Sequence, residues 1–228
     1  MKKILTVAAT TLCLASAALA QPYPSNGFVG LYGDAAGTQC CINAPAGAPA
    51  TFYLWATLGG ATAAGISGAE FRMEFSQNIS ALGFFQAFSS PVPNTLILGT
   101  PFDYTAGVDG AGGAAEGMNL AFQECQTGTS GRVLLGSVAG FISGAISNCE
   151  VTTRRRNPPN NLILGDCPLF TLCDAPTFTL VCTTISTGVN GGETIAFRSG
   201  INQAACSSSC TPVGVEQKTW SGMKSLFR

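Results

Sequence analysis

The stretch Ala69-Glu-Phe-Arg-Met-Glu-Phe75 decides the fold class, because apolar and charged side chains alternate along it. A period of two residues is the repeat of a β-strand. Its apolar side chains share one face, which we expect to lie in the core: Phe71, Met73 and Phe75. Its charged side chains share the other face, which we expect to be solvated: Glu70, Arg72 and Glu74.

Comparable β-favouring runs, bounded by Gly, Pro, Asn and Asp, recur along the chain. We expect strands at residues 28–32, 51–58, 69–75, 79–88, 95–98, 118–124, 132–142, 161–165, 177–185 and 194–198. Segment 132–142 is apolar on both faces, as a central strand is. The density of strands predicts an all-β fold, an antiparallel β-sandwich of the Ig-like or jelly-roll kind.

The N-terminus has the pattern of a bacterial secretory signal peptide. Lys2 and Lys3 precede an apolar run over residues 4–18, and Ala18-Leu-Ala20 has the small-x-small form of a cleavage site. The apolar run is too short to remain as a membrane span. We therefore expect residues 1–20 to be removed and the protein to be secreted, extracellular or held in the cell envelope.

The remaining chain divides into two parts. Residues 21–212 are expected to form one β-sandwich domain, and residues 213–228 a C-terminal tail. Trp220, Met223 and Phe227 are spaced at i, i+3 and i+7, which allows a short amphipathic helix. The tail is either a frayed or docked terminus or a sorting tag.

Composition excludes several function classes. The chain has no histidine, which excludes Ser-His-Asp and Cys-His catalysis and imidazole metal sites. Without Lys2 and Lys3, nine basic side chains stand against twelve acidic ones. A nucleic-acid partner would require a basic face, so none is expected.

Nine cysteines follow the predicted cleavage site, and in an exported chain they predict disulfides. They are Cys40, Cys41, Cys125, Cys149, Cys167, Cys173, Cys182, Cys206 and Cys210. The odd number leaves at least one thiol or an inter-chain disulfide. Adjacent Cys40 and Cys41 should bond to different partners, since a vicinal bridge is strained. The local alternatives are Cys125–Cys149, Cys167–Cys173 or Cys167–Cys182, and Cys206–Cys210. No CxxC spacing supports a metal or redox site.

No catalytic or cofactor-binding motif is present, so we expect a protein that is not an enzyme and needs no cofactor. Glu70 and Glu74 lie on one strand face, but their backbones would be about 13 Å apart. Paired glycosidase carboxylates are about 5–9.5 Å apart. The alternative is a secreted glycosidase-type hydrolase with carboxylates from separate loops, such as Asp34, Asp103 or Asp166. Asp103, Asp109 and Glu116 are too dispersed for a calcium-loop motif, and structural calcium on scattered loop oxygens is kept as an alternative.

Two groups of residues are candidate ligand contacts. Tyr53 and Trp55 lie in an expected strand, where they are either aromatic anchors or core residues. Arg154, Arg155 and Arg156 precede two prolines and are typical of a solvated turn that could contact an anion or a polysaccharide. The expected partner is a protein or glycan at the cell surface.

Residues 65–82 resemble the early strand pair of cohesin-like bacterial β-sandwiches, in which an alternating aromatic strand leads through a turn into a second strand. Gln77-Asn78 stands where that family usually has Asp-Pro. Residues 131–141 resemble a later apolar strand of the same family. The resemblance implies a sandwich that binds a protein or glycan without catalysis. With its motif at residues 167–178 and its basic aromatic tail, the chain is also similar to exported proteins of environmental bacteria that have no assigned activity.

Overall fold

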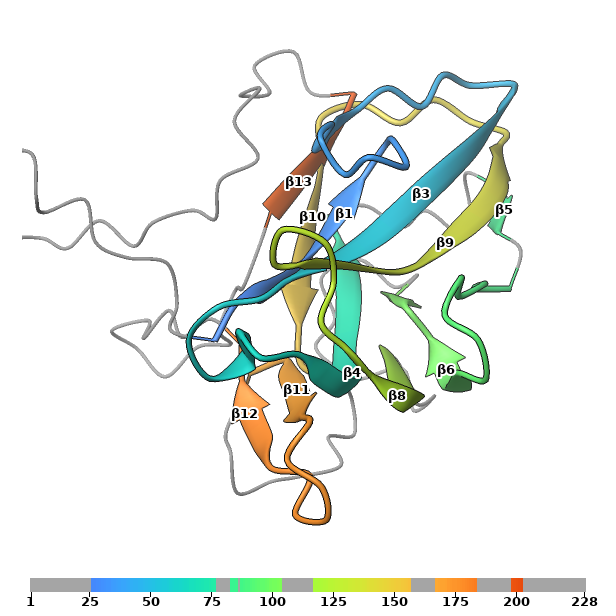
Figure 1. The fold of residues 1–228 in the computed structure, drawn as a ribbon. Coiled ribbons are helices and arrows are strands. Elements are labelled where there is room, and N and C mark those ends of the chain that lie inside the picture. Colours follow the sequence, from blue (N-terminus) through green and yellow to red (C-terminus); the bar gives the residue numbers. More distant parts are fainter. Residues whose placement is uncertain are drawn as a thin grey trace, which may run out of the picture.

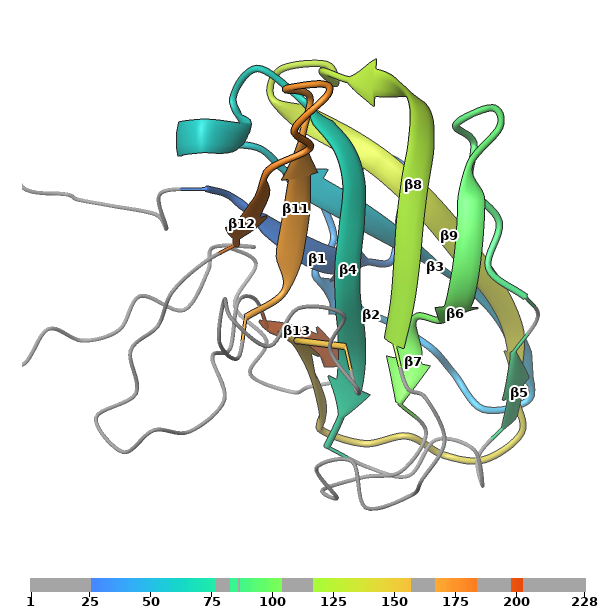
Figure 2. The same ribbon diagram turned by 90° about the horizontal axis from the view of Figure 1, so that it is seen from below.

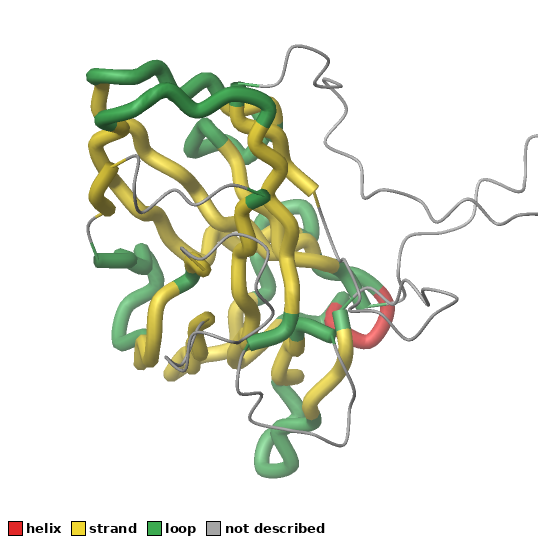
Figure 3. The backbone as a smooth tube through the Cα atoms, turned by 180° about the vertical axis from the view of Figure 1, so that it is seen from behind, coloured by secondary structure: helices red, strands yellow, loops and turns green. Residues whose placement is uncertain are grey.

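The protein is a β-sandwich, as predicted. The computed structural model describes residues 26–76, 83–85, 87–103, 117–156, 167–183 and 198–202. Two sheets lie face to face, and within these residues the only helical element is the 3₁₀ turn η1 (Gly60–Thr62) (Figures 1, 2 and 3). The predicted signal peptide and C-terminal tail lie outside the described residues.

In the described residues, the first sheet has four strands in the order β1-β3-β9-β5. Their bounds are β1 Phe28–Tyr32, β3 Ala48–Thr57, β9 Arg132–Ile142 and β5 Gly83–Phe85. All pairs in this sheet are antiparallel. The bounds of β1 and β9 coincide with the predicted strands. Along β9 buried and half-buried residues mostly alternate, so this strand buries chiefly one face rather than both.

The second sheet has nine strands within the part of the chain that the structure describes. Six of them follow the order β12-β11-β4-β10-β13-β2. Of the other three, β8 lies between β4 and β6, and β7 pairs with β4. Their bounds are β2 Cys41–Ile42, β4 Ile66–Phe75, β6 Leu96–Thr100, β7 Phe102–Asp103, β8 Gly117–Gln126, β10 Cys149–Arg154, β11 Leu169–Leu172, β12 Leu180–Cys182 and β13 Arg198–Ile201. Two short pairs, β13 with β2 and β4 with β7, are parallel. The predicted strand at 161–165 lies outside the described residues.

Strand β4 contains the alternating stretch at residues 69–75 and pairs with four other strands of the nine-stranded sheet. Strands β11 and β8 pair with its first half, and β10 and β7 pair with its second half. Its apolar face points into the core, where Phe71, Met73 and Phe75 are almost fully buried. This half of the prediction is confirmed.

The charged face of β4 is not solvated, and here the prediction is wrong. Arg72 is 1% exposed and Glu70 6% exposed. Arg154 lies opposite Arg72 in the β10–β4 register. Both arginines bind the same carboxylate, with Arg72 Nη2 3.2 Å and Arg154 Nη2 3.0 Å from oxygens of Glu74. Glu74 therefore compensates part of the positive charge of the two arginines, and such pairing lowers the cost of withdrawing charged side chains from water.

The core lies between the sheets and is rich in aromatic side chains. The Phe102 ring packs edge-on against Phe52 of β3 at 6.2 Å and against Phe75 of β4 at 5.2 Å, measured between centroids. Edge-to-face contacts at these separations are favourable. Phe102, only 1% exposed, thus joins the two layers. Among the described residues, no helix has the length and apolar character needed to cross a membrane.

Buried hydroxyls add polar links between the sheets. Thr153 Oγ1 of β10 donates to the carbonyl oxygen of Val29 at 2.7 Å, and Ser199 Oγ of β13 donates to that of Leu31 at 2.6 Å. Both acceptors are in β1. These bonds satisfy polar groups that would otherwise be buried without a partner.

Candidate binding surface

Trp55, one of the two predicted aromatic anchors, is covered by its own protein. The Arg132 guanidinium carbon lies 4.8 Å from the centroid of the Trp55 ring and 5.1 Å from that of Tyr32. Arg132 Nη2 also donates to the carbonyl oxygen of Gly37 at 2.9 Å. A cation over an aromatic face is an attractive contact. Trp55 therefore packs against the cluster of Phe28, Tyr32 and Cys40 rather than presenting a bare ring.

Gly37 is required for this covering. Its φ is +66°, and a Cβ at this position would lie 2.8 Å from Trp55 Nε1 and 2.5 Å from Arg132 Nη2. A side chain would therefore displace the arginine from the indole, and the left-handed backbone also favours glycine. Tyr53 lies on the same sheet face, half-buried, opposite Tyr32 and Ser137. Its role in ligand contact stays a prediction.

The three arginines do not form the predicted solvated turn. Arg154 is the last residue of β10 and its side chain is 19% exposed in its ion pair with Glu74. Arg155 and Arg156 are half-buried as well. Strand β10 includes Arg154, which is paired with Glu74 of the neighbouring strand β4. The sequence pattern around Arg154 does not reveal this partner. An anion contact by these residues stays a prediction.

Of the loop carboxylates considered for hydrolysis, the structure describes the side chain of Asp34. Asp34 accepts hydrogen bonds from the amides of Thr38 and Gln39, both at 2.8 Å, and from Thr38 Oγ1 at 2.7 Å. Burial raises the pKa of Asp34, but these hydrogen bonds outweigh it and hold the pKa below its ordinary value of 3.8. The Asp103 side chain and Asp166 lie outside the described residues. Among the described residues, no group of three or more Cys, Asp or Glu side chains could hold a metal ion.

A different surface emerges at the hairpin formed by β11 and β12, whose connection we name the Phe178 loop (residues 173–179). In Figure 1 this loop projects beyond the sandwich at the foot of the view. Phe178 is 50% exposed. Its φ of 49° is unusual for a bulky residue. The predicted strand at residues 177–185 is wrong at residues 177–179, which precede β12 and follow the turn signals Asp174 and Pro176.

Hydrogen bonds within the Phe178 loop fix its shape. Asp174 accepts from the amide of Thr179 at 2.8 Å and from Thr179 Oγ1. The amide of Thr177 donates to the Asp174 carbonyl at 3.0 Å, and the amide of Leu172 donates to the Thr179 carbonyl at 2.8 Å. A single carboxylate therefore ties the two ends of the loop together.

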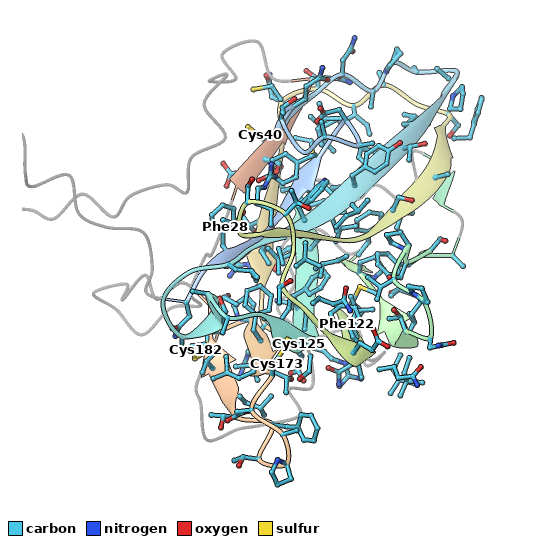
Figure 4. All side chains as sticks on the ribbon, in the orientation of Figure 1. Phe28, Cys40, Phe122, Cys125, Cys173 and Cys182 are labelled. Atoms are coloured by element: carbon cyan, nitrogen blue, oxygen red, sulfur yellow. A yellow bond between two sulfur atoms is a disulfide. The ribbon has the colours of Figure 1, made fainter. Side chains whose placement is uncertain are left out.

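Two disulfides hold the same hairpin (Figure 4). Cys173, the first residue of the loop, is bonded to Cys125 of β8. Cys167, which precedes β11, is bonded to Cys182 of β12. Gly65 makes room for the first bridge, because a Cβ there would lie 2.6 Å from Cys125 Sγ. The Phe178 loop is thus covalently anchored at its base.

These pairings correct part of the sequence analysis. Of the two alternatives for Cys167, the structure has the bond to Cys182. Cys125 does not pair with Cys149, whose buried thiol lies in the core 3.8 Å from Ser76 Oγ. Cys40 and Cys41 are also in disulfides. Cys206 and Cys210 lie outside the described residues. Proximity in sequence failed as a guide for Cys125 because its partner Cys173 follows β11, and β8 and β11 are brought together by their pairing with β4.

We expect the stability contributed by Asp174 to depend on pH. The side-chain hydrogen bond from Thr179, followed by its backbone hydrogen bond, holds the pKa of Asp174 below its ordinary value of 3.8. A lowered folded-state pKa stabilises the fold above the unfolded pKa, and this contribution is lost as the pH falls through the folded value. Asp174→Asn should therefore be less stable than the wild type near about pH 7, and the difference should vanish as the pH falls below the folded-state pKa of Asp174.

Denaturant unfolding of both proteins across this pH range measures the difference. Thr179→Val is the matched control: it removes the side-chain donor and should move the pKa of Asp174, followed by NMR, up toward 3.8. A wild-type Asp174 that titrates at or above 3.8 would contradict the assignment.

Comparisons with known proteins give a likeness of fold. No protein-family model matches the chain, and no curated protein matches it. The chain is similar to the sixth cohesin of scaffoldin B from Acetivibrio cellulolyticus, solved in complex with a dockerin, with 13% identity and a TM-score of 0.44 over 78% of this chain and 99% of that chain. It is also similar to a cohesin module of a family 33 glycoside hydrolase from Clostridium perfringens, with 9% identity and a TM-score of 0.43 over 78% of this chain and 98% of that one. Both of these solved structures are cohesin modules.

Proposed function

We propose that the protein is an exported, non-catalytic binding module that contacts a protein partner through the Phe178 loop. The observation that carries the proposal is an exposed aromatic side chain on a loop anchored by two disulfides. Ordering a loop before binding removes part of the entropy cost of association. Aromatic anchors that fill a pocket on the partner dominate the energetics of protein interfaces.

The chemistry of the loop favours a protein over other partners. Asp174 is the one charged residue in residues 173–179, so the loop has no cation to draw it to an anionic membrane. Its carboxylate already accepts hydrogen bonds from Thr179, which leaves it poorly placed to bind sugar hydroxyls. Pro176 and Phe178 are both exposed and apolar, and an apolar pocket would accept them.

Export is supported by the disulfides, which persist in oxidising compartments. The competing proposal of a secreted hydrolase has less support. Glu74 is held by two arginines and Asp34 by the backbone of its own loop, so both carboxylates already have structural roles.

We expect Phe178→Ala to weaken partner binding by at least about 30-fold, since truncating an anchor residue typically costs about 2 kcal/mol or more. The mature protein, residues 21–228, is used to capture proteins from the extracellular and envelope fractions of its source, and the captured protein is then titrated by calorimetry. A glycan array run in parallel tests the other partner class.

Thr177→Ala is the matched control, because this neighbouring side chain is also exposed and only its amide takes part in the loop hydrogen bonds described above. It should bind like the wild type. Equal affinity of Phe178→Ala and the wild type for the captured protein, or specific binding to glycans alone, would overturn the proposal.

A further inference from the structure

Strand β6 is an apolar edge of the nine-stranded sheet. Within the described residues, β6 pairs with β8 alone, and Figure 2 shows it at the outer side of the β4-β8-β6 limb. Alternate residues of a strand direct their N–H and C=O groups to opposite edges. One edge of β6 therefore offers backbone donors and acceptors to an additional strand.

The side chains of β6 are unusual for such an edge. Leu96 is 57% exposed and Leu98 52% exposed, whereas Ile97 between them packs against the core. Proteins commonly protect an edge with a charged side chain or a proline within the strand. Residues 96–98 contain neither, and the flanking prolines, Pro93 and Pro101, lie outside the strand.

The opposite end of the same sheet provides a contrast. Strand β12 is also an edge, but its residues Leu180, Val181 and Cys182 are all half-buried, and Cys182 is cross-linked to Cys167. The exposed apolar character is therefore a property of β6 and not of every edge in this sheet.

From this edge we infer that two copies of the protein associate by antiparallel pairing of their β6 strands. A two-fold axis at Ile97 places Leu96 of each copy directly opposite Leu98 of the other. Directly opposed residues share a face of the sheet, so the four leucines form one cluster on the outer face. The pairing is self-complementary, as a two-fold interface requires.

Charge also permits this occupant. Strand β6 is uncharged, and the outward residues of β8 that face it are Asn119 and Ala121. Two copies therefore meet without like-charge repulsion. A five-residue edge is small beside the roughly 1,200–2,000 Å² of stable interfaces, so the association should be reversible and depend on concentration.

Sedimentation equilibrium of residues 21–228, the chain without its predicted signal peptide, from about 1 μM to about 1 mM tests the inference. We expect the average mass to rise from that of a monomer toward that of a dimer. Over the same range, NMR amide shifts should change in residues 95–99 and in the facing residues of β8. The double variant Leu96→Lys/Leu98→Lys should raise the dissociation constant at least tenfold, because it places four cations at the interface.

Thr51→Lys is the control, since it places a cation at an exposed position of β3 in the other sheet and should leave the association unchanged. Both leucines are exposed, so the double variant should fold, and its thermal unfolding verifies this. A protein that stays monomeric at the highest concentration would overturn the inference. So would dimers that survive the double substitution, or shift changes confined to other strands.

Discussion

Replacing Cys125 and Cys173 together by serine should lower the free energy of unfolding by about 4 kcal/mol. The bridge joins residues 48 apart in sequence, so it removes a large loop-closure entropy from the unfolded chain. Replacing Cys167 and Cys182, which are 15 apart, should cost less, about 3 kcal/mol. Denaturant unfolding measures both changes in the free energy of unfolding. The buffer contains neither an oxidant nor a reductant, so that the remaining disulfides stay intact.

Cys149→Ala is the control for this series. Its thiol is buried but takes part in no disulfide, so the substitution removes one packed sulfur atom without opening a loop. Its cost should stay below about 2 kcal/mol. If the Cys125/Cys173 variant unfolded at the wild-type denaturant concentration, the bridge would not restrain the unfolded chain as described.

Phe102→Ala should lower the free energy of unfolding by about 3–5 kcal/mol, the range for deleting a buried aromatic ring. The ring contacts Phe52 of one sheet and Phe75 of the other, so the cavity would open between the layers. Phe102→Leu fills much of that space and should cost distinctly less.

Phe178→Ala serves as the matched aromatic truncation at the surface. Because half of that ring is already exposed, its stability should change by no more than about 0.5 kcal/mol. Thermal and denaturant unfolding of the three variants give the comparison. A Phe102→Ala protein as stable as Phe178→Ala would show that the ring does not join the two sheets.

Local periodicity was sufficient to predict the fold class and several strands. The alternation at residues 69–75 identified the core face of β4, and the bounds of β1 and β9 followed from their apolar runs. Strand β10 was missed because its sequence, Cys149 to Arg154, ends in an arginine run that is typical of a turn. Alternation of apolar and charged residues assigns them to the two faces of a strand. It does not show whether the charged face is in contact with water or covered by other residues.

The candidate site was less accessible to sequence reasoning, for a physical reason. Trp55 was singled out by residue type, yet Arg132 and Gly37, distant in sequence, decide that its ring is covered. Phe178 lay inside an expected strand, and its exposure depends on a loop closed by Asp174 and a disulfide from β8. Such features arise from contacts between distant residues, which a single sequence does not encode locally.

The buried charges of β4 have a consequence for how this chain avoids misfolding. If β4 slipped by one residue against its neighbours, every side chain would exchange faces. The charged side chains of Glu70, Arg72 and Glu74 would enter the apolar core. The apolar side chains of Phe71, Met73 and Phe75 would leave it. The ion pair between Glu74 of β4 and Arg154 of β10 would break at the same time. A β4 strand shifted by one residue is therefore disfavoured both electrostatically and hydrophobically. The charged side chains thus help to fix the register of this strand.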